Sequence, residues 1–292
     1  MRRLLLAAGL ATAAPRMHAD PPALRFGISQ KLLVGVNLSD ARAAFVLWSH
    51  EILASIGFHL VNQEFILPSE RLQSGLRAGT LDFVVLTIPE FRKVRAYVDT
   101  SQIISDQSGG EELLLLVKDA GPMKTLTDLR DRTLLIHDHA WTNMASEWLT
   151  VSLARESLPD PESLFRQITR SPKLSQVVLP VFFGQADACI TSRRSFATMT
   201  ELNPQLSKQL RPLAVSPRLV AALVACRKDY PAALRQKLVG RILDLRSDAS
   251  TRQMLTLFQS ATYKSWGEDL IQPTLALLDT YDKQQASKGV RP

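Results

Sequence analysis

Residues 76–85 read Leu-Arg-Ala-Gly-Thr-Leu-Asp-Phe-Val-Val, and residues 181–190 read Val-Phe-Phe-Gly-Gln-Ala-Asp-Ala-Cys-Ile. Each stretch has the pattern of a helix end, a glycine stop, a turn that carries Asp, and a buried strand. The glycines are 184 − 79 = 105 residues apart, and so are the aspartates, 187 − 82 = 105. This repetition predicts two similarly built α/β lobes, although Gly-x-x-Asp before a strand is also ordinary turn chemistry. Two such lobes would be expected to bind a ligand between them.

Helical and strand patterns alternate on both sides of the first stretch. Residues 40–56 carry apolar side chains on one helical face, and Gly57 follows at the position that ends many helices. Residues 24–28 and 58–66 have the composition of strands. The alternation predicts that each lobe is a mostly parallel sheet flanked by helices on both faces.

Two continuous apolar runs, residues 113–117 and 219–226, bracket the second set of elements. We interpret them as strands that carry the chain out to an inserted lobe and back, which gives a two-strand hinge. The expected division is a signal peptide at 1–19, the first part of lobe 1 at 20–118, an inserted lobe 2 at 119–218, and the completion of lobe 1 at 219–292. A hinge with two crossings allows rigid-body closure around a ligand.

The N-terminus predicts export. The chain begins Met1-Arg2-Arg3, continues with 11 apolar residues at 4–14, and places Ala19 before a polar residue. This is the pattern of a secretory signal peptide, and the run is too short to span a bilayer. Cleavage after Ala19 removes three arginines, so the formal charge of the mature chain is 35 − 3 − 28 = +4. We therefore expect a soluble, exported protein that does not bind nucleic acid.

The remaining composition argues against metal binding and catalysis. His137 and His139 have no third ligand at a recognised metal spacing, and no nucleophile motif or phosphate-binding glycine loop accompanies them. Neither a metal nor a cofactor is expected. Cys189 and Cys226 both lie in apolar runs, and the sequence leaves open whether they form a disulfide or remain buried thiols.

The layout resembles the type II periplasmic substrate-binding proteins of ABC importers, and within them the phosphate/phosphite/phosphonate-binding family. The resemblance covers nearly the whole mature chain, and its order and spacing are more specific than any single motif. The segments that carry it are residues 24–28, 76–82, 113–117, 128–134 and 183–188.

The resemblance implies a monomeric binding protein that is not an enzyme. Its ligand would be a small polar, anionic solute of the phosphate or phosphonate type, and its partner an inner-membrane ABC permease. Family members that bind phosphonates carry Asp and a Ser-Thr-Ser-Gly cluster after the first strand of lobe 2. Here that stretch is Asp138-His-Ala-Trp-Thr-Asn-Met144, in which only Asp138 and Thr142 match. The family's next cleft histidine would fall near Lys173.

Ligands of open α/β sheets lie beyond the carboxyl ends of the strands, where helix N-termini can hold anions. On this basis, six residues are candidate ligand contacts, and most have a structural alternative. The residues of N-cap type can simply cap helices, the tryptophan can be a core anchor, and the lysine can be solvated. The six residues are Asn37, Thr87, Trp141, Thr142, Asn143 and Lys173. Asp82 and Asp187 lie at the opposite ends of their strands and are expected to form turns.

Two other functions remain open at this point. A sensory protein of the same fold would present its closed form to a membrane receptor. A periplasmic enzyme would turn over its solute instead of binding it reversibly.

Overall fold

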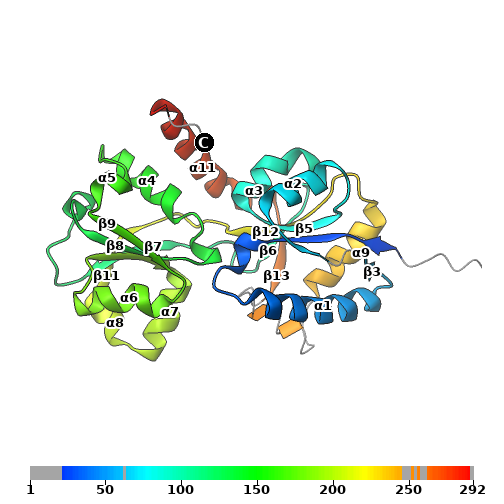
Figure 1. Cartoon of the computed structure of the whole chain (residues 1–292), viewed down its shortest axis with the longest axis horizontal. Coiled ribbons are helices and arrows are strands. Elements are labelled where there is room, and N and C mark those ends of the chain that lie inside the picture. Colours follow the sequence, from blue (N-terminus) through cyan, green and yellow to red (C-terminus); the bar gives the residue numbers. More distant parts are fainter. Residues whose placement is uncertain (1–21, 62–63, 245–250, 253–254, 257–261, 290–292) are drawn as a thin grey trace, which may run out of the picture.

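The computed structural model describes residues 22–61, 64–244, 251–252, 255–256 and 262–289. The expected signal peptide at 1–19 lies outside these residues. Two α/β lobes lie side by side, each built on its own central sheet (Figure 1). The expected fold class is confirmed: two sheets flanked by helices, with two chain crossings between the lobes.

Lobe 1 contains a six-stranded sheet in the order β13-β6-β12-β5-β2-β4. Helices α2 and α3 cover one face of the sheet, and α1 and α9 cover the other (Figure 1). A separate parallel pair, β1 with β3, lies beside the sheet. The bounds are β1 Ala23–Leu24, β2 Phe26–Ser29, α1 Leu38–Ser55, β3 His59–Leu60, β4 Ile66–Leu67, α2 Ser69–Arg77, β5 Phe83–Thr87, α3 Ile88–Val94, β6 Ile103–Asp106, β12 Ala222–Cys226, α9 Ala232–Leu243 and β13 Tyr263–Trp266.

Lobe 2 contains a five-stranded sheet in the order β11-β7-β10-β8-β9. Helices α4 and α5 lie on one face, and α6, α7 and α8 lie on the other (Figure 1). The bounds are β7 Leu113–Lys118, β8 Thr133–His137, α4 Ala145–Arg155, α5 Pro161–Leu164, β9 Gln167–Ser171, α6 Leu174–Phe183, β10 Ala188–Ser192, α7 Arg193–Leu202, α8 Gln205–Gln209 and β11 Leu210–Val215. The short 3-10 turns are η1 Gln30–Leu33, η2 Arg95–Tyr97, η3 Leu126–Leu129, η4 Ala140–Thr142 and η5 Glu268–Ile271.

The 105-residue repeat is a structural repeat. Strands β5 and β10 have the same length and the same offset, and each runs directly into a helix, α3 or α7. Gly79 and Gly184 both adopt a positive φ, +68° and +75°, which side chains with a Cβ rarely adopt. Asp82 accepts hydrogen bonds from Arg25, and Asp187 accepts hydrogen bonds from Thr133. Both aspartates thus fasten the turn before their strand, as expected.

Each sheet was expected to be mostly parallel, but both sheets contain parallel and antiparallel pairs. Strands β2, β4 and β5 are parallel, and so are β8, β9 and β10. However, β12 is antiparallel to β5 and β6, and β7 is antiparallel to β10 and β11. The outgoing strand β7 and the returning strand β12 are antiparallel to their neighbours. A continuous apolar run in the sequence indicates that a strand is buried on both faces, but it does not indicate the direction of the strand.

The crossing between the lobes lies ahead of β7. Glu111 and Leu219 form an isolated antiparallel bridge, with N–H···O distances of 2.9 and 2.8 Å in the two directions. Because β7 pairs in the second sheet, we place the boundary of lobe 1 at Glu111 instead of the expected residue 118. The return boundary at Leu219 coincides with the bridge.

A C-terminal helix, α11 (Gln272–Ser287), makes a third connection between the lobes. It rises from lobe 1 and contacts α3 in lobe 1 and α4 in lobe 2 (Figure 1). Leu275, Leu277 and Leu278 of α11 belong to one apolar cluster that includes buried residues of both lobes. Burial of this apolar surface stabilises the arrangement of the two lobes.

The two cysteines remain free and buried, Cys189 in β10 and Cys226 in β12. They therefore lie in different sheets. Among the described residues, no helix is long and apolar enough to cross a membrane, and no cluster of side chains suits a metal ion.

Candidate functional site

A pocket of about 600 Å³, including open solvent at its mouth, lies between the two lobes. Lobe 1 contributes η1 and the loop after it, together with β5, β6, β12 and β13, and lobe 2 contributes the turn that follows β8. The turn lies at the carboxyl end of β8, where ligands of α/β sheets bind. This position, with walls from both lobes, suits a small solute that touches both of them.

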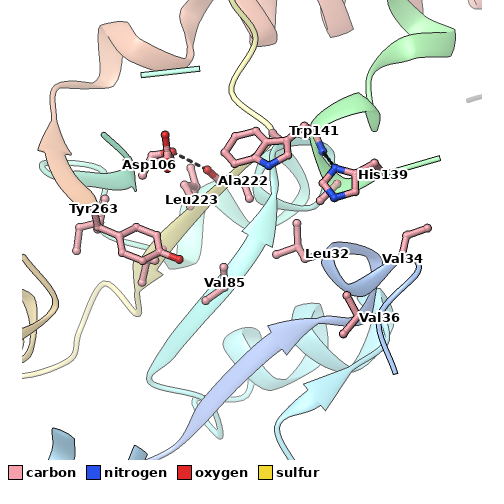
Figure 2. A pocket seen from close by; sticks show the side chains of 15 residues that line it. Leu32, Val34, Val36, Val85, Asp106, His139, Trp141, Ala222, Leu223 and Tyr263 are labelled. Carbon is pink, nitrogen blue, oxygen red and sulfur yellow. Dashed lines mark hydrogen bonds between the residues drawn. The ribbon is translucent and has the colours of Figure 1, made fainter. Parts of the chain in front are cut away.

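Most of the pocket wall is apolar. Leu32, Val34 and Val36 form one side of it, and Val85, Leu223 and Val224 belong to the strands behind. Figure 2 shows the rings of Trp141 and His139 across from the η1 side chains. The polar groups in the wall are therefore few, and their chemistry decides what the pocket can hold.

A hydrogen bond in the turn after β8 determines which ring nitrogen of His139 carries the proton. Its Nδ1 accepts a hydrogen bond from the backbone N–H of Trp141 at 3.2 Å, so the proton of the neutral ring lies on Nε2. Burial, and then the charge of a protonated His137, lower the pKa of His139 to about 4. The two rings stack with their centroids 5.2 Å apart. At neutral pH, His139 therefore presents an uncharged N–H donor.

This depressed pKa predicts a loss of stability in mild acid. The unfolded chain takes up a proton near pH 6.5 and the folded chain only near pH 4, so the free energy of unfolding should fall as the pH drops through this window. The expected loss is about 2–3 kcal/mol, measured by urea unfolding at pH 7 and pH 4.5. His139→Asn should flatten this dependence, whereas His59→Asn, outside the pocket, should keep it. An unchanged slope in His139→Asn would contradict the assignment.

Trp141 carries an unused hydrogen-bond donor. Its indole Nε1 is buried and has no hydrogen-bond partner, and the ring edge with this nitrogen faces the pocket beside Ala222 (Figure 2). The guanidinium of Arg194, from α7, lies 4.7 Å from the centre of the ring, in the geometry of a cation–π contact. Trp141 is thus held in place while its N–H remains available.

Arg194 also connects the lobes through charged groups. Its side chain lies 3.1 Å from Asp106 at the end of β6, 3.3 Å from Glu111 at the crossing, and 2.9 Å from the hydroxyl of Ser108. The carboxylates are 4% and 9% exposed, and the Arg194 side chain is 33% exposed. Arg194, Asp106 and Glu111 thus form one charged group that joins the lobes.

Trp141 and Asn143 are the expected site residues that the structure brings to the pocket or its immediate surroundings. Trp141 lines the pocket. The amide of Asn143 donates to the carbonyl of Ala221 in lobe 1 at 3.1 Å, and its Oδ1 is buried without a partner. Asn143 therefore joins lobe 2 to the returning chain instead of pointing freely toward a ligand.

Thr142 and Thr87 are buried and use their hydroxyls inside the protein. Thr142 donates to the carbonyl of His137 and closes the turn after β8. Thr87 donates to Glu90 at 2.9 Å, and its backbone N–H donates to the same oxygen at 3.0 Å. Each threonine is 2% exposed, so the structure places both behind the pocket wall.

Glu90 is a buried anion at the N-terminus of α3. It is 2% exposed, and its second oxygen accepts hydrogen bonds from the hydroxyls of Ser29, at 2.8 Å, and Ser69. Negative charge is favoured at a helix N-terminus. The carboxylate of the chain itself therefore occupies the N-terminus of α3, where the Thr87 hydroxyl was expected to contact a ligand.

Asn37 and Lys173 lie outside the pocket lining. Asn37 is the N-cap of α1, and its side chain accepts from the N–H groups of Ser39 and Asp40. Lys173 is exposed and precedes α6. A Cβ built on Gly35 would lie 3.2 Å from Pro172, so the loops before Asn37 and Lys173 lie close together.

Sequence reasoning missed His139, Arg194, Asp106 and Glu90. The spacing Thr87-x-x-Glu90 is a capping-box pattern and could have identified Glu90. The carboxylates that pair with Arg194, Glu111 and Asp106, are 83 and 88 residues away in the sequence, and no local pattern joins them to it.

A family model described as the periplasmic substrate-binding protein of phosphonate ABC transporters matches residues 63–269. A search of curated protein sequences finds no match.

Solved structures of low sequence identity share the fold. A binding protein of an ABC phosphonate transporter from Pseudomonas aeruginosa is 15% identical, with a TM-score of 0.60 over 92% of this chain and 89% of its own. PhnD1 from Prochlorococcus marinus, in complex with methylphosphonate, is 14% identical, with a TM-score of 0.60 over 90% and 100%. The aliphatic sulphonate-binding protein SsuA from Escherichia coli is 13% identical, with a TM-score of 0.52 over 92% and 89%.

Proposed function

Because the chain belongs to the periplasmic substrate-binding proteins of phosphonate ABC transporters, we propose that it captures a small solute between its lobes and delivers it to an inner-membrane permease. The family consists of substrate-binding transport proteins, not enzymes. The observation that carries the proposal is the pocket itself, whose wall is shared by both lobes.

The proposed mechanism is closure of the lobes around the solute. A ligand that touches η1 and β12 of lobe 1 and the His139–Trp141 turn of lobe 2 interacts fully only when the lobes are closed. Its differential affinity for the closed state shifts the population toward that state. The crossing at Glu111 and Leu219 supplies the hinge.

The solute class has two candidates. The first is the small polar, anionic solute of the phosphate or phosphonate type that the sequence resemblance implies. The second is an uncharged solute, which the apolar wall and the neutral donors favour.

A thermal-shift screen of the mature protein tests the proposed function. The panel comprises phosphate, phosphonates, sulfonates, carboxylates and uncharged amides and ketones. At least one class should raise the melting temperature, because a ligand that binds only the native state stabilises it. The responding solute should be recovered unchanged after incubation. A folded protein that responds to no member of the panel, or that converts the solute chemically, would contradict the proposal.

A further inference from the structure

Among the described residues, the cation that contacts the pocket wall, Arg194, is paired with carboxylates. Among the described residues whose side chains line the pocket, there is no lysine or arginine. Arg194 contacts the wall through Trp141, but it is paired with Asp106 and Glu111. An anion placed here would lose its hydration and lie near the carboxylate of Asp106, with no lysine or arginine among the described lining residues, which is unfavourable in a low-dielectric site.

The hydroxyls that could replace a cation are also committed elsewhere. Thr142 donates to a carbonyl within its own turn. Ser29, Ser69 and Thr87 donate to Glu90, which is the buried anion of lobe 1. The hydroxyls of these four residues therefore do not face an incoming oxyanion.

Trp141 and His139 each offer an uncharged donor to a ligand. The indole N–H of Trp141 is buried without a partner at the edge of the pocket. The imidazole of His139 lines the same pocket, and its Nδ1 accepts from the backbone. Both donors suit a carbonyl oxygen or a ring nitrogen, because a neutral acceptor gains a hydrogen bond without the desolvation cost of a charge.

We propose that the cleft binds an uncharged solute with an apolar or aromatic body and a hydrogen-bond acceptor directed at Trp141 and His139. The body would contact Leu32, Val36 and Leu223, and the acceptor would approach the lobe 2 turn. This inference rests on the proposed function, since it names the class of solute that the same cleft captures.

Sets of solutes that share one body and differ in charge test this inference. Each set pairs a phenyl, cyclohexyl or n-butyl group with an amide, a carboxylate, a phosphonate and an amidinium. Thermal shift and titration calorimetry on the mature protein should detect binding by amide members and none by their anionic partners. A carboxylate, phosphonate or amidinium that binds more tightly than the matched amide would overturn the inference and leave the proposed function intact. A folded protein that binds no member would contradict both.

Two tryptophan variants test whether the acceptor group of the solute binds the indole N–H of Trp141. Trp141→Phe keeps an aromatic ring and removes the N–H, so the affinity for the amide should fall about five-fold or more. Trp266→Phe is the matched control, because its Nε1 is also buried without a partner but lies outside the pocket lining. This control should retain wild-type affinity. Equal affinity of wild type and Trp141→Phe for the amide would contradict the assigned contact.

Discussion

Replacing Arg194 with methionine should lower the free energy of unfolding by about 3 kcal/mol. The substitution leaves Asp106 and Glu111 as carboxylates that are 4% and 9% exposed and have lost their shared cation. Stranding a buried charge costs more than the intact pair contributes, and the partial exposure of Arg194 moderates the loss. Urea unfolding monitored by circular dichroism measures the difference.

The same variant should change the relation between the lobes. Arg194 lies in lobe 2, Asp106 lies in lobe 1, and Glu111 lies at the crossing, so their contact stabilises the present arrangement of the two lobes. Small-angle X-ray scattering should show a larger radius of gyration for Arg194→Met than for wild type.

Arg193→Met provides the matched control. Its partner is Glu112, and the side chains are 52% and 31% exposed, so the expected loss is below about 1 kcal/mol. If both variants lose the same stability, or if Arg194→Met keeps the wild-type dimensions, the lobe-connecting role of Arg194 is wrong.

Replacing Glu90 with alanine should cost about 4 kcal/mol. The hydroxyls of Ser29, Ser69 and Thr87 and the backbone N–H of Thr87 would lose their acceptor in a site that is closed to water. Glu90→Gln keeps one acceptor oxygen and should lose about half as much. Thermal and urea unfolding of the purified variants measure both effects.

Glu70→Ala separates this effect from simple helix capping. Glu70 also lies in the first turn of a helix, α2, but it is exposed. Its loss should change the stability by no more than about 0.5 kcal/mol. A Glu90→Ala variant as stable as Glu70→Ala would show that the buried hydrogen bonds contribute little.

The repeat was visible in the sequence because its determinants are local. Gly79 and Gly184 need a positive φ, and the apolar residues after Asp82 and Asp187 form strands that are buried on both faces. These requirements act over a few residues, so the same pattern appears twice. They predicted the two lobes and the turns that position the strands.

Strand direction was not visible because it depends on distant segments. The apolar residues of β7 and β12 are the same whether their neighbours run parallel or antiparallel. Only the path of the chain, out through one crossing and back through the other, decides the direction.

The candidate site was only partly predictable for a similar reason. Trp141 was expected at the cleft wall, and it lies there. Thr87 and Thr142 have the residue type of a ligand contact, but whether a hydroxyl faces a ligand depends on what else is within reach. In the fold, the Thr87 hydroxyl donates to Glu90, and the Thr142 hydroxyl donates to the carbonyl of His137.

The central claim, that a solute binds in the cleft between the lobes, is tested most directly by titration calorimetry on a cleft-filling variant. Ala222 lines the pocket on β12, and in Ala222→Trp the large side chain would occupy the space assigned to the solute (Figure 2). The solute that responds in the thermal-shift screen should bind wild type with a stoichiometry of about one per chain, and should show no heat of binding with the folded variant. Wild-type affinity in Ala222→Trp would contradict the claim and place the solute elsewhere.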